Sequence, residues 1–159
     1  MPESLDALAV QVGQALMASG EKLATAESCT GGWVAQAVTS VAGSSDWFER
    51  GWVTYSNAAK RDELGVAEAT LERHGAVSEQ TAREMAAGAL RRAGAGLALS
   101  VTGVAGPGGG SAAKPVGMVC FAWARGSKIR SETRHFTGDR ESVRRQSVAY
   151  ALKGLLEPL

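Results

Sequence analysis

The stretch Leu97–Thr102, which reads LALSVT, is a nearly continuous apolar run of strand length. A strand without a polar face is typical of the centre of a sheet that is covered on both sides. The run leads directly into the glycine-rich segment 103–115, which reads GVAGPGGGSAAKP. The sequence therefore predicts a central strand followed by a loop whose glycines let the backbone approach a ligand closely.

The residues before this strand alternate between helical and strand-like patterns. The predicted elements are a helix from Leu5 to Gly20, a strand over 22–26, a helix over 33–41, a strand over 48–55, a helix that Ser56 and Asn57 cap and that ends near Gly65, and a helix that Ser78 caps and Gly94 ends. Serine and asparagine are favoured caps because their side-chain oxygens accept hydrogen bonds from unpaired N–H groups, and glycine commonly ends a helix.

The residues after the glycine-rich segment predict a hairpin and a final helix. They read as strands over 116–124 and 129–136 around the turn Arg125–Lys128, and then as a helix that begins near Asp139 and buries Val148, Leu152 and Leu155. The whole pattern predicts an α/β fold, a single-domain three-layer α/β/α sandwich with a mixed sheet of about five or six strands. Neither a linker nor an internal repeat is visible, so we expect one domain over residues 1–159.

The composition excludes several classes of protein. Hydrophobic residues make up 45% of the 159 and charged residues 21%, which is ordinary for a globular domain. The net charge of +1 gives no broad basic field for nucleic acid. No apolar run approaches the roughly 18–20 residues that cross a bilayer, and the acidic start MPESLDALAV is unlike a signal peptide. We expect a cytoplasmic protein that binds neither nucleic acid nor membrane.

The two cysteines, Cys29 and Cys120, are too few for a disulfide framework and lack the CxxC spacing of a metal site. This usage is natural for a reducing compartment. No spacing of histidine, cysteine and acidic residues suits a catalytic metal, so we expect neither a metal nor another cofactor.

Three segments place small and hydroxylated residues just after predicted strands. They read TAESCTGG over 25–32, YSNAAK over 55–60 and TGVAGPGGG over 102–110. Ligands bind at the carboxyl ends of strands in open α/β sheets. Ser28 stands directly before a helix start whose free N–H groups could stabilise an oxyanion or a phosphate. From this segment alone, the simpler interpretation is that Ser28 and Thr30 only cap the helix.

A serine nucleophile needs a base. His74 precedes a glycine at a predicted helix end, and His135 lies in an alternating strand, so both favour structural or surface roles. Lys60 follows a strand and begins a helix; in a water-poor cleft its pKa would fall and its neutral amine could accept a proton. A solvated helix lysine is the alternative. A further alternative is that Cys29 is the nucleophile, although no histidine is evidently near it.

The glycine-rich segment matches no phosphate-binding motif. It lacks the Gly-Lys-Ser/Thr of a Walker A loop, and Ser111 replaces the last glycine of GxGxxG. Ser111 and Lys114 match the SxxK spacing of penicillin-recognising enzymes. That motif opens a helix, whereas this one lies in a loop ended by Pro115, so we interpret it as a chance match.

The segments TAESCTGG, YSNAAK, SVTGVAGPGGGSAAKPVG and FTGDRESVR, in this order and spacing, resemble the CinA C-terminal domain family over nearly the whole chain. Full-length CinA proteins resemble the chain only in their C-terminal part, so we expect the stand-alone form. The resemblance implies a nicotinamide-nucleotide amidase, which converts nicotinamide mononucleotide to nicotinate mononucleotide and ammonia in pyridine nucleotide recycling. It also suggests a homo-oligomer.

The resemblance assigns roles to individual residues. The family's serine maps onto Ser28, its lysine onto Lys60, and its hydroxyl residue after the central strand onto Thr102, where many relatives carry serine. Thr102 would relay a proton or orient the lysine, and the amides of Gly31 and Gly32 would hold the oxyanion. The expected substrate contacts are Thr30, Gly31, Gly32, Tyr55, Asn57, Gly106 and Arg140.

Three alternatives remain open at this point. Tyr55 could stack on the pyridine ring or lie in the core. Arg140 and Arg144 could hold the phosphate or be ordinary surface arginines. The chain could also be a non-catalytic nucleotide-binding module, because a fold does not guarantee turnover.

Overall fold

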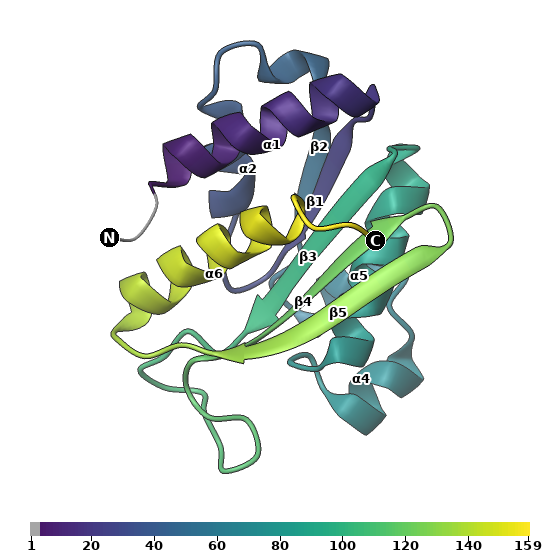
Figure 1. The fold of residues 1–159 in the computed structure, drawn as a ribbon. Coiled ribbons are helices and arrows are strands. Elements are labelled where there is room, and N and C mark those ends of the chain that lie inside the picture. The colour runs from purple at the N-terminus through teal and green to yellow at the C-terminus, as the bar shows by residue number, and fades with distance from the viewer. Residues whose placement is uncertain (1–3) are drawn as a thin grey trace.

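The computed structural model describes residues 4–159, which fold around one five-stranded sheet in the order β2–β1–β3–β4–β5 (Figure 1). The strands are β1 (Leu23–Glu27), β2 (Phe48–Val53), β3 (Leu97–Gly103), β4 (Met118–Arg125) and β5 (Lys128–His135). β1 pairs in parallel with β2 and β3, whereas β4 runs antiparallel to β3 and β5. The sheet is therefore mixed, and the predicted central strand is its middle strand.

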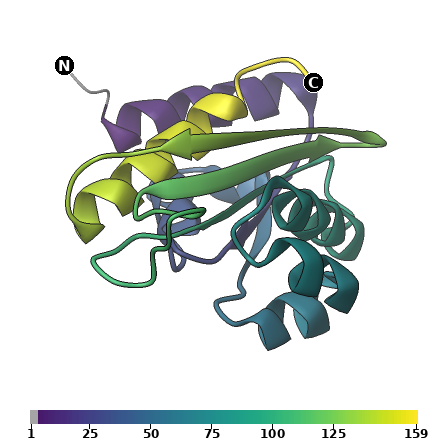
Figure 2. The ribbon, with the colours of Figure 1, turned by 90° about the horizontal axis from the view of Figure 1, so that it is seen from below.

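Helices cover both faces of this sheet (Figure 2). One layer contains α1 (Leu5–Ser19), α2 (Trp33–Thr39) and α6 (Arg140–Gly154), and the other contains α3 (Asn57–Leu64), α4 (Glu68–His74) and α5 (Glu79–Ala93). A short 3-10 helix, η1 (Ser44–Asp46), precedes β2. The three-layer sandwich and the number of strands are confirmed. The sequence indicated α4 only by its end, because Ala67 at its start offers no capping side chain.

The helix α3, which carries Lys60, is fixed at both ends and against its neighbour. The hydroxyl of Ser56 accepts a hydrogen bond from the backbone N–H three residues on, and Gly65 ends the helix with a φ of 72°. A Cβ at Gly88 of α5 would collide with the carbonyl oxygen of Leu64. Glycine at that position therefore lets α3 lie directly against α5.

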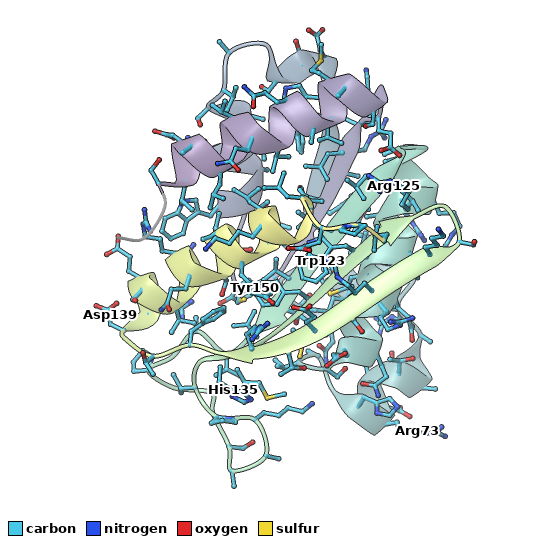
Figure 3. The ribbon with its side chains drawn as sticks, in the orientation of Figure 1. Arg73, Trp123, Arg125, His135, Asp139 and Tyr150 are labelled. Carbon is cyan, nitrogen blue, oxygen red and sulfur yellow. The ribbon has the colours of Figure 1, made fainter. Side chains whose placement is uncertain are left out.

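The core differs on the two sides of the sheet. On the side of α6, the rings of Phe121 and Trp123 stack with centroids 5.8 Å apart, and Tyr150 of α6 packs on Phe121 at 5.0 Å. The rings of Trp123 and Tyr150 also lie near each other (Figure 3). Between α5 and β4 the core consists of small side chains, which are Ala82, Ala86, Cys120, Ala122 and Ala124. These small residues allow α5 to approach the sheet closely. The helix α3 in turn packs against α5.

The parallel strands bring the predicted site segments to one edge of the sheet. Glu27, at the end of β1, pairs in register with Val53 of β2 and Val101 of β3. The segments that follow these three strands therefore begin side by side, as expected at the carboxyl edge of an α/β sheet. No helix within residues 4–159 is long and apolar enough to span a membrane.

Candidate active site

Ser28 begins the turn that joins β1 to α2. Its N–H donates to the Val101 carbonyl at 2.9 Å, so the sheet holds its backbone. The N–H of Gly31 closes the turn on the Ser28 carbonyl at 3.0 Å. Gly31 and Gly32 have φ angles of 59° and 101°, in a region that residues with a Cβ rarely adopt. These glycines allow the chain to reverse into α2 directly after the serine.

The carboxylate of Glu27 holds the start of α2. It accepts hydrogen bonds from the Thr30 hydroxyl at 2.6 Å, from Val34 N at 2.8 Å and from Ala35 N at 3.1 Å. Glu27 is 1% exposed, and the N-cap residue Gly32 has no side chain that could serve these N–H groups. A carboxylate is favourable at a helix N-terminus because it faces the positive end of the helix dipole. Glu27 therefore fixes the whole turn, and the Thr30 side chain is part of this network.

Lys60, in the first turn of α3, reaches back to the serine. Its Nζ donates to Ser28 Oγ at 3.0 Å, to the Thr54 carbonyl at 2.9 Å and to the Tyr55 carbonyl at 3.2 Å. The two side chains come from positions 32 residues apart. Lys60 is only 1% exposed, so the alternative of a solvated surface lysine is wrong.

Burial makes the amine of Lys60 easier to deprotonate than that of a solvated lysine. Burial lowers the pKa of its amine from 10.5 to about 8, because the protonated form loses its hydration; the side chain of Cys29 acts in the opposite direction with a smaller effect. The three acceptors around Nζ match the three N–H bonds of an ammonium group. The site thus contains a serine hydroxyl beside an amine whose pKa lies near neutral pH.

Neither Cys29 nor a histidine occupies a comparable position. Burial raises the pKa of the Cys29 thiol to about 12, so its reactive thiolate form is disfavoured. His74 ends α4. His135 ends β5 (Figure 3). Within residues 4–159, no hydrogen bond joins either imidazole to Ser28. Of Lys60, His74 and His135, only Lys60 makes a hydrogen bond with the Ser28 hydroxyl among the described residues.

The hydroxyl of Thr102 is directed to a different partner. Thr102 is buried at the end of β3, beside the site segments, and its Oγ1 donates to the Ala76 carbonyl at 2.9 Å. No direct hydrogen bond to Lys60 occurs among the described residues. The assigned role of Thr102 as a proton relay or orienting group stays a prediction.

Three of the expected substrate contacts meet in a second cluster. Arg140, at the start of α6, donates to the Gly106 carbonyl at 2.7 Å and to the Tyr55 hydroxyl at 3.2 Å. Tyr55 is 62% exposed, so the alternative of a core tyrosine is wrong. Asn57 is exposed at the start of α3. The cluster joins the glycine-rich segment, Tyr55, which is the second residue after β2, and α6. It lies beside the serine–lysine pair, because the Tyr55 carbonyl accepts from Lys60.

Arg144, one turn further along α6, binds the serine turn itself. Its Nε donates to the Cys29 carbonyl and its Nη2 to the Thr30 carbonyl, both at 3.1 Å. Its guanidinium lies 5.4 Å from the centroid of the Trp33 ring. Arg144 is therefore directed at the serine turn, and the alternative of an ordinary surface arginine is wrong for it.

Comparison with known proteins assigns the chain to a family. The family model described as the CinA C-terminal domain matches residues 5–159. The chain belongs to this family. In the same part of the chain, no group of three or more histidine, cysteine or acidic residues is arranged to hold a metal ion.

Relatives within the CinA C-terminal domain family cover nearly all of the chain. The nicotinamide-nucleotide amidohydrolase PncC of Escherichia coli (strain K12) is 59% identical over 150 residues, which are 93% of this chain and 90% of the relative. The protein of the same name from Pseudomonas putida is 52% identical over 155 residues, or 98% and 97% of the two chains. A crystal structure of the competence/damage inducible protein CihA from Agrobacterium tumefaciens superposes with a TM-score of 0.94 at 46% identity, covering 98% and 96%.

Sequence reasoning missed one residue of this CinA domain site, Glu27, and it also missed the contact that Arg144 makes. Glu27 carried a signal, since it is the only charged residue of β1 and precedes a helix start without a capping side chain. Arg144 carried none, because its partners are main-chain carbonyls, which every residue has.

Proposed function

We propose that the chain hydrolyses the carboxamide of nicotinamide mononucleotide, giving nicotinate mononucleotide and ammonia, with Ser28 as nucleophile and Lys60 as base. The observation that carries the proposal is the buried Lys60 Nζ, 3.0 Å from Ser28 Oγ. The names of the relatives from Escherichia coli and Pseudomonas putida support the substrate.

In the first step, Ser28 Oγ attacks the carboxamide carbon while the neutral amine of Lys60 accepts the hydroxyl proton. The Ser28 hydroxyl is 3.5 Å from the Tyr55 carbonyl, too far to hold its proton firmly. A neutral amine has two N–H bonds, which can stay on the Thr54 and Tyr55 carbonyls. Its lone pair then faces the serine, as a base requires.

The oxyanion that forms needs hydrogen-bond donors. The N–H of Gly31 is engaged by the Ser28 carbonyl. The N–H groups of Thr30 and Gly32 make no hydrogen bond to another group within residues 4–159. Thr30 is fully buried whereas Gly32 is partly exposed, so the Gly32 N–H is the accessible donor of the turn. Protonated Lys60 then donates to the departing ammonia, and water cleaves the acyl-enzyme with Lys60 again as base.

The second cluster suits the remainder of the substrate. The exposed ring of Tyr55 offers a stacking surface for the pyridine, and the guanidinium of Arg140 offers charge-assisted hydrogen bonds for the phosphate. Cys29 and Cys120 are unpaired and buried, which fits the reducing cytoplasm. Assembly into a homo-oligomer belongs to the same proposal and would be measured by sedimentation.

The deciding experiment is ammonia release from nicotinamide mononucleotide by the purified chain, with the nucleotide product followed by chromatography. A non-catalytic binding module would bind the nucleotide without releasing ammonia. The reaction should also proceed unchanged after treatment with a chelator, because the proposed steps use no metal. Loss of activity on chelation that one added metal restores would contradict the mechanism.

A further inference from the structure

Arg144 directs its guanidinium at the backbone of the serine turn rather than at an acidic side chain. It reaches from α6 to the carbonyls of Cys29 and Thr30, the two residues that follow Ser28. α6 lies beside α2 in the same layer, so the contact joins the last helix of the chain to the first strand–helix connection (Figure 1). An arginine donates through a planar, rigid group, and two simultaneous bonds therefore fix the orientation of both peptide groups.

These bonds determine where the N–H groups of the turn point. The peptide bond between Cys29 and Thr30 is trans, and in a trans peptide the C=O and the N–H point in opposite directions. Holding the Cys29 carbonyl toward α6 therefore turns the Thr30 N–H away from α6. That N–H makes no hydrogen bond within residues 4–159, whereas the neighbouring Gly31 N–H is already used by the turn.

The remaining groups of Thr30 are also held. Its hydroxyl donates to Glu27 at 2.6 Å and its carbonyl accepts from Arg144 at 3.1 Å. Thr30 is thus fixed from β1 on one side and from α6 on the other, and it is fully buried.

We propose that Arg144 is a positioning residue for the amidase reaction: it holds the Cys29 and Thr30 carbonyls and thereby fixes the turn that carries Ser28. This inference rests on the proposed function and adds a support for the nucleophile to it. It also separates Arg144 from substrate phosphate, because two of its guanidinium nitrogens are occupied by the backbone.

The test compares Arg144→Met and Arg144→Lys with Arg145→Met, which removes the adjacent arginine of α6; no hydrogen bond within residues 4–159 ties Arg145 to the turn. For the Arg144 variants we expect kcat for nicotinamide mononucleotide to fall roughly 10- to 100-fold, with KM within about twofold of the parent. Arg145→Met should match the parent. Guanidinium ion added to Arg144→Ala should restore part of kcat.

A second substrate separates positioning from phosphate binding. With nicotinamide riboside, which lacks the phosphate, the Arg144 variants should show the same fractional loss of kcat. A raised KM with intact kcat, or an effect that disappears with the riboside, would overturn the inference and assign Arg144 to the phosphate.

Folding is controlled by thermal unfolding of each variant. If Arg144→Met does not fold, the kinetics of Arg144→Lys test the inference instead. Lysine keeps the positive charge and most of the side-chain length but cannot make the two hydrogen bonds of the guanidinium. An active parent with unimpaired Arg144 variants would reject only the positioning role. A parent that releases no ammonia would reject the proposed function, and this inference with it.

Discussion

Two serine–lysine pairs can be compared in this chain, and they differ in the burial of the serine and in the contact between the two side chains. Ser111 and Lys114 are close in sequence; the Lys114 N–H donates to Ser111 Oγ at 3.1 Å, and the Lys114 ammonium bonds the His74 carbonyl. Ser111 is exposed in the loop between β3 and β4. Ser28 and Lys60 come from different elements, yet their side chains lie 3.0 Å apart and both are buried.

In the proposed mechanism, burial of the lysine and not its spacing from the serine along the chain would allow it to act as a base. The loop pair satisfies a sequence pattern, but its lysine closes a turn and ties the loop to α4. The buried pair matches no short pattern, but its lysine has lost its water and its pKa falls to about 8. Four predictions test this difference, in order of decreasing effect.

The largest effect is expected for the buried pair. Ser28→Ala and Lys60→Arg should each lower kcat/KM by about 10³-fold or more, since both groups act in one step. Arginine keeps the charge but stays protonated, so it cannot accept the serine proton. The measurement is steady-state ammonia release, with circular dichroism to verify folding. Substantial turnover by folded Lys60→Arg would exclude the lysine as base.

The second prediction concerns pH. Below its pKa, Lys60 is protonated and cannot act as a base, so activity is lost as pH falls. With a pKa of about 8, kcat/KM should drop about 50-fold between pH 8 and pH 6. A pH series at low substrate measures this limb. A histidine base would give a limb near ~6.5 instead, and the limb would vanish in His74→Ala or His135→Ala.

The third prediction concerns Glu27, whose carboxylate holds the turn. Glu27→Gln removes the charge at the start of α2 and one acceptor oxygen. We expect kcat to fall about tenfold and the free energy of unfolding to fall by about 1–3 kcal/mol. Urea unfolding and kinetics measure the two effects.

A matched control for Glu27 is available in the same molecule. Glu79 accepts hydrogen bonds from the Ser131 and Thr133 hydroxyls of β5, both at 2.8 Å, without contacting the serine turn. Glu79→Gln should lower stability but leave kcat near the parent value. Equal loss of kcat in both variants would mean that Glu27 acts only through general stability.

The smallest effects are expected for the loop pair. Ser111→Ala removes an exposed hydroxyl and should change kcat/KM by less than about twofold and the free energy of unfolding by within about 0.5 kcal/mol. Lys114→Met loses the link to His74 and should mainly lower stability by about 0.5–1.5 kcal/mol. A large loss of activity in Ser111→Ala would move the chemistry to the loop.

Most of the fold could be predicted from local chemistry. The apolar run Leu97–Thr102 identified the central strand, and Ser56, Ser78 and Asp139 marked helix starts with side chains that cap them. These signals are readable because they depend on neighbours within one turn. The start of α4 was missed because Ala67 supplies no such side chain.

The site could be predicted only in part. Ser28 and Lys60 were inferred from strand ends, the lack of a well-placed histidine and the family resemblance, and the structure brings their side chains together. The contact from Arg144 to the Cys29 and Thr30 carbonyls joins positions more than 100 residues apart through main-chain acceptors. Only the packing of α6 beside α2 reveals it.

The backbone of Tyr55 contacts Lys60, whereas its side chain faces the solvent. Its carbonyl accepts from Lys60 at 3.2 Å, whereas its ring is largely exposed beside Arg140. Thr54 likewise holds the lysine through its carbonyl, at 2.9 Å. Every amino acid supplies the same carbonyl, so substitution at these positions leaves the lysine's holders in place. A substitution of the Tyr55 side chain would therefore change the exposed surface beside Arg140 without removing a hydrogen-bond acceptor from Lys60.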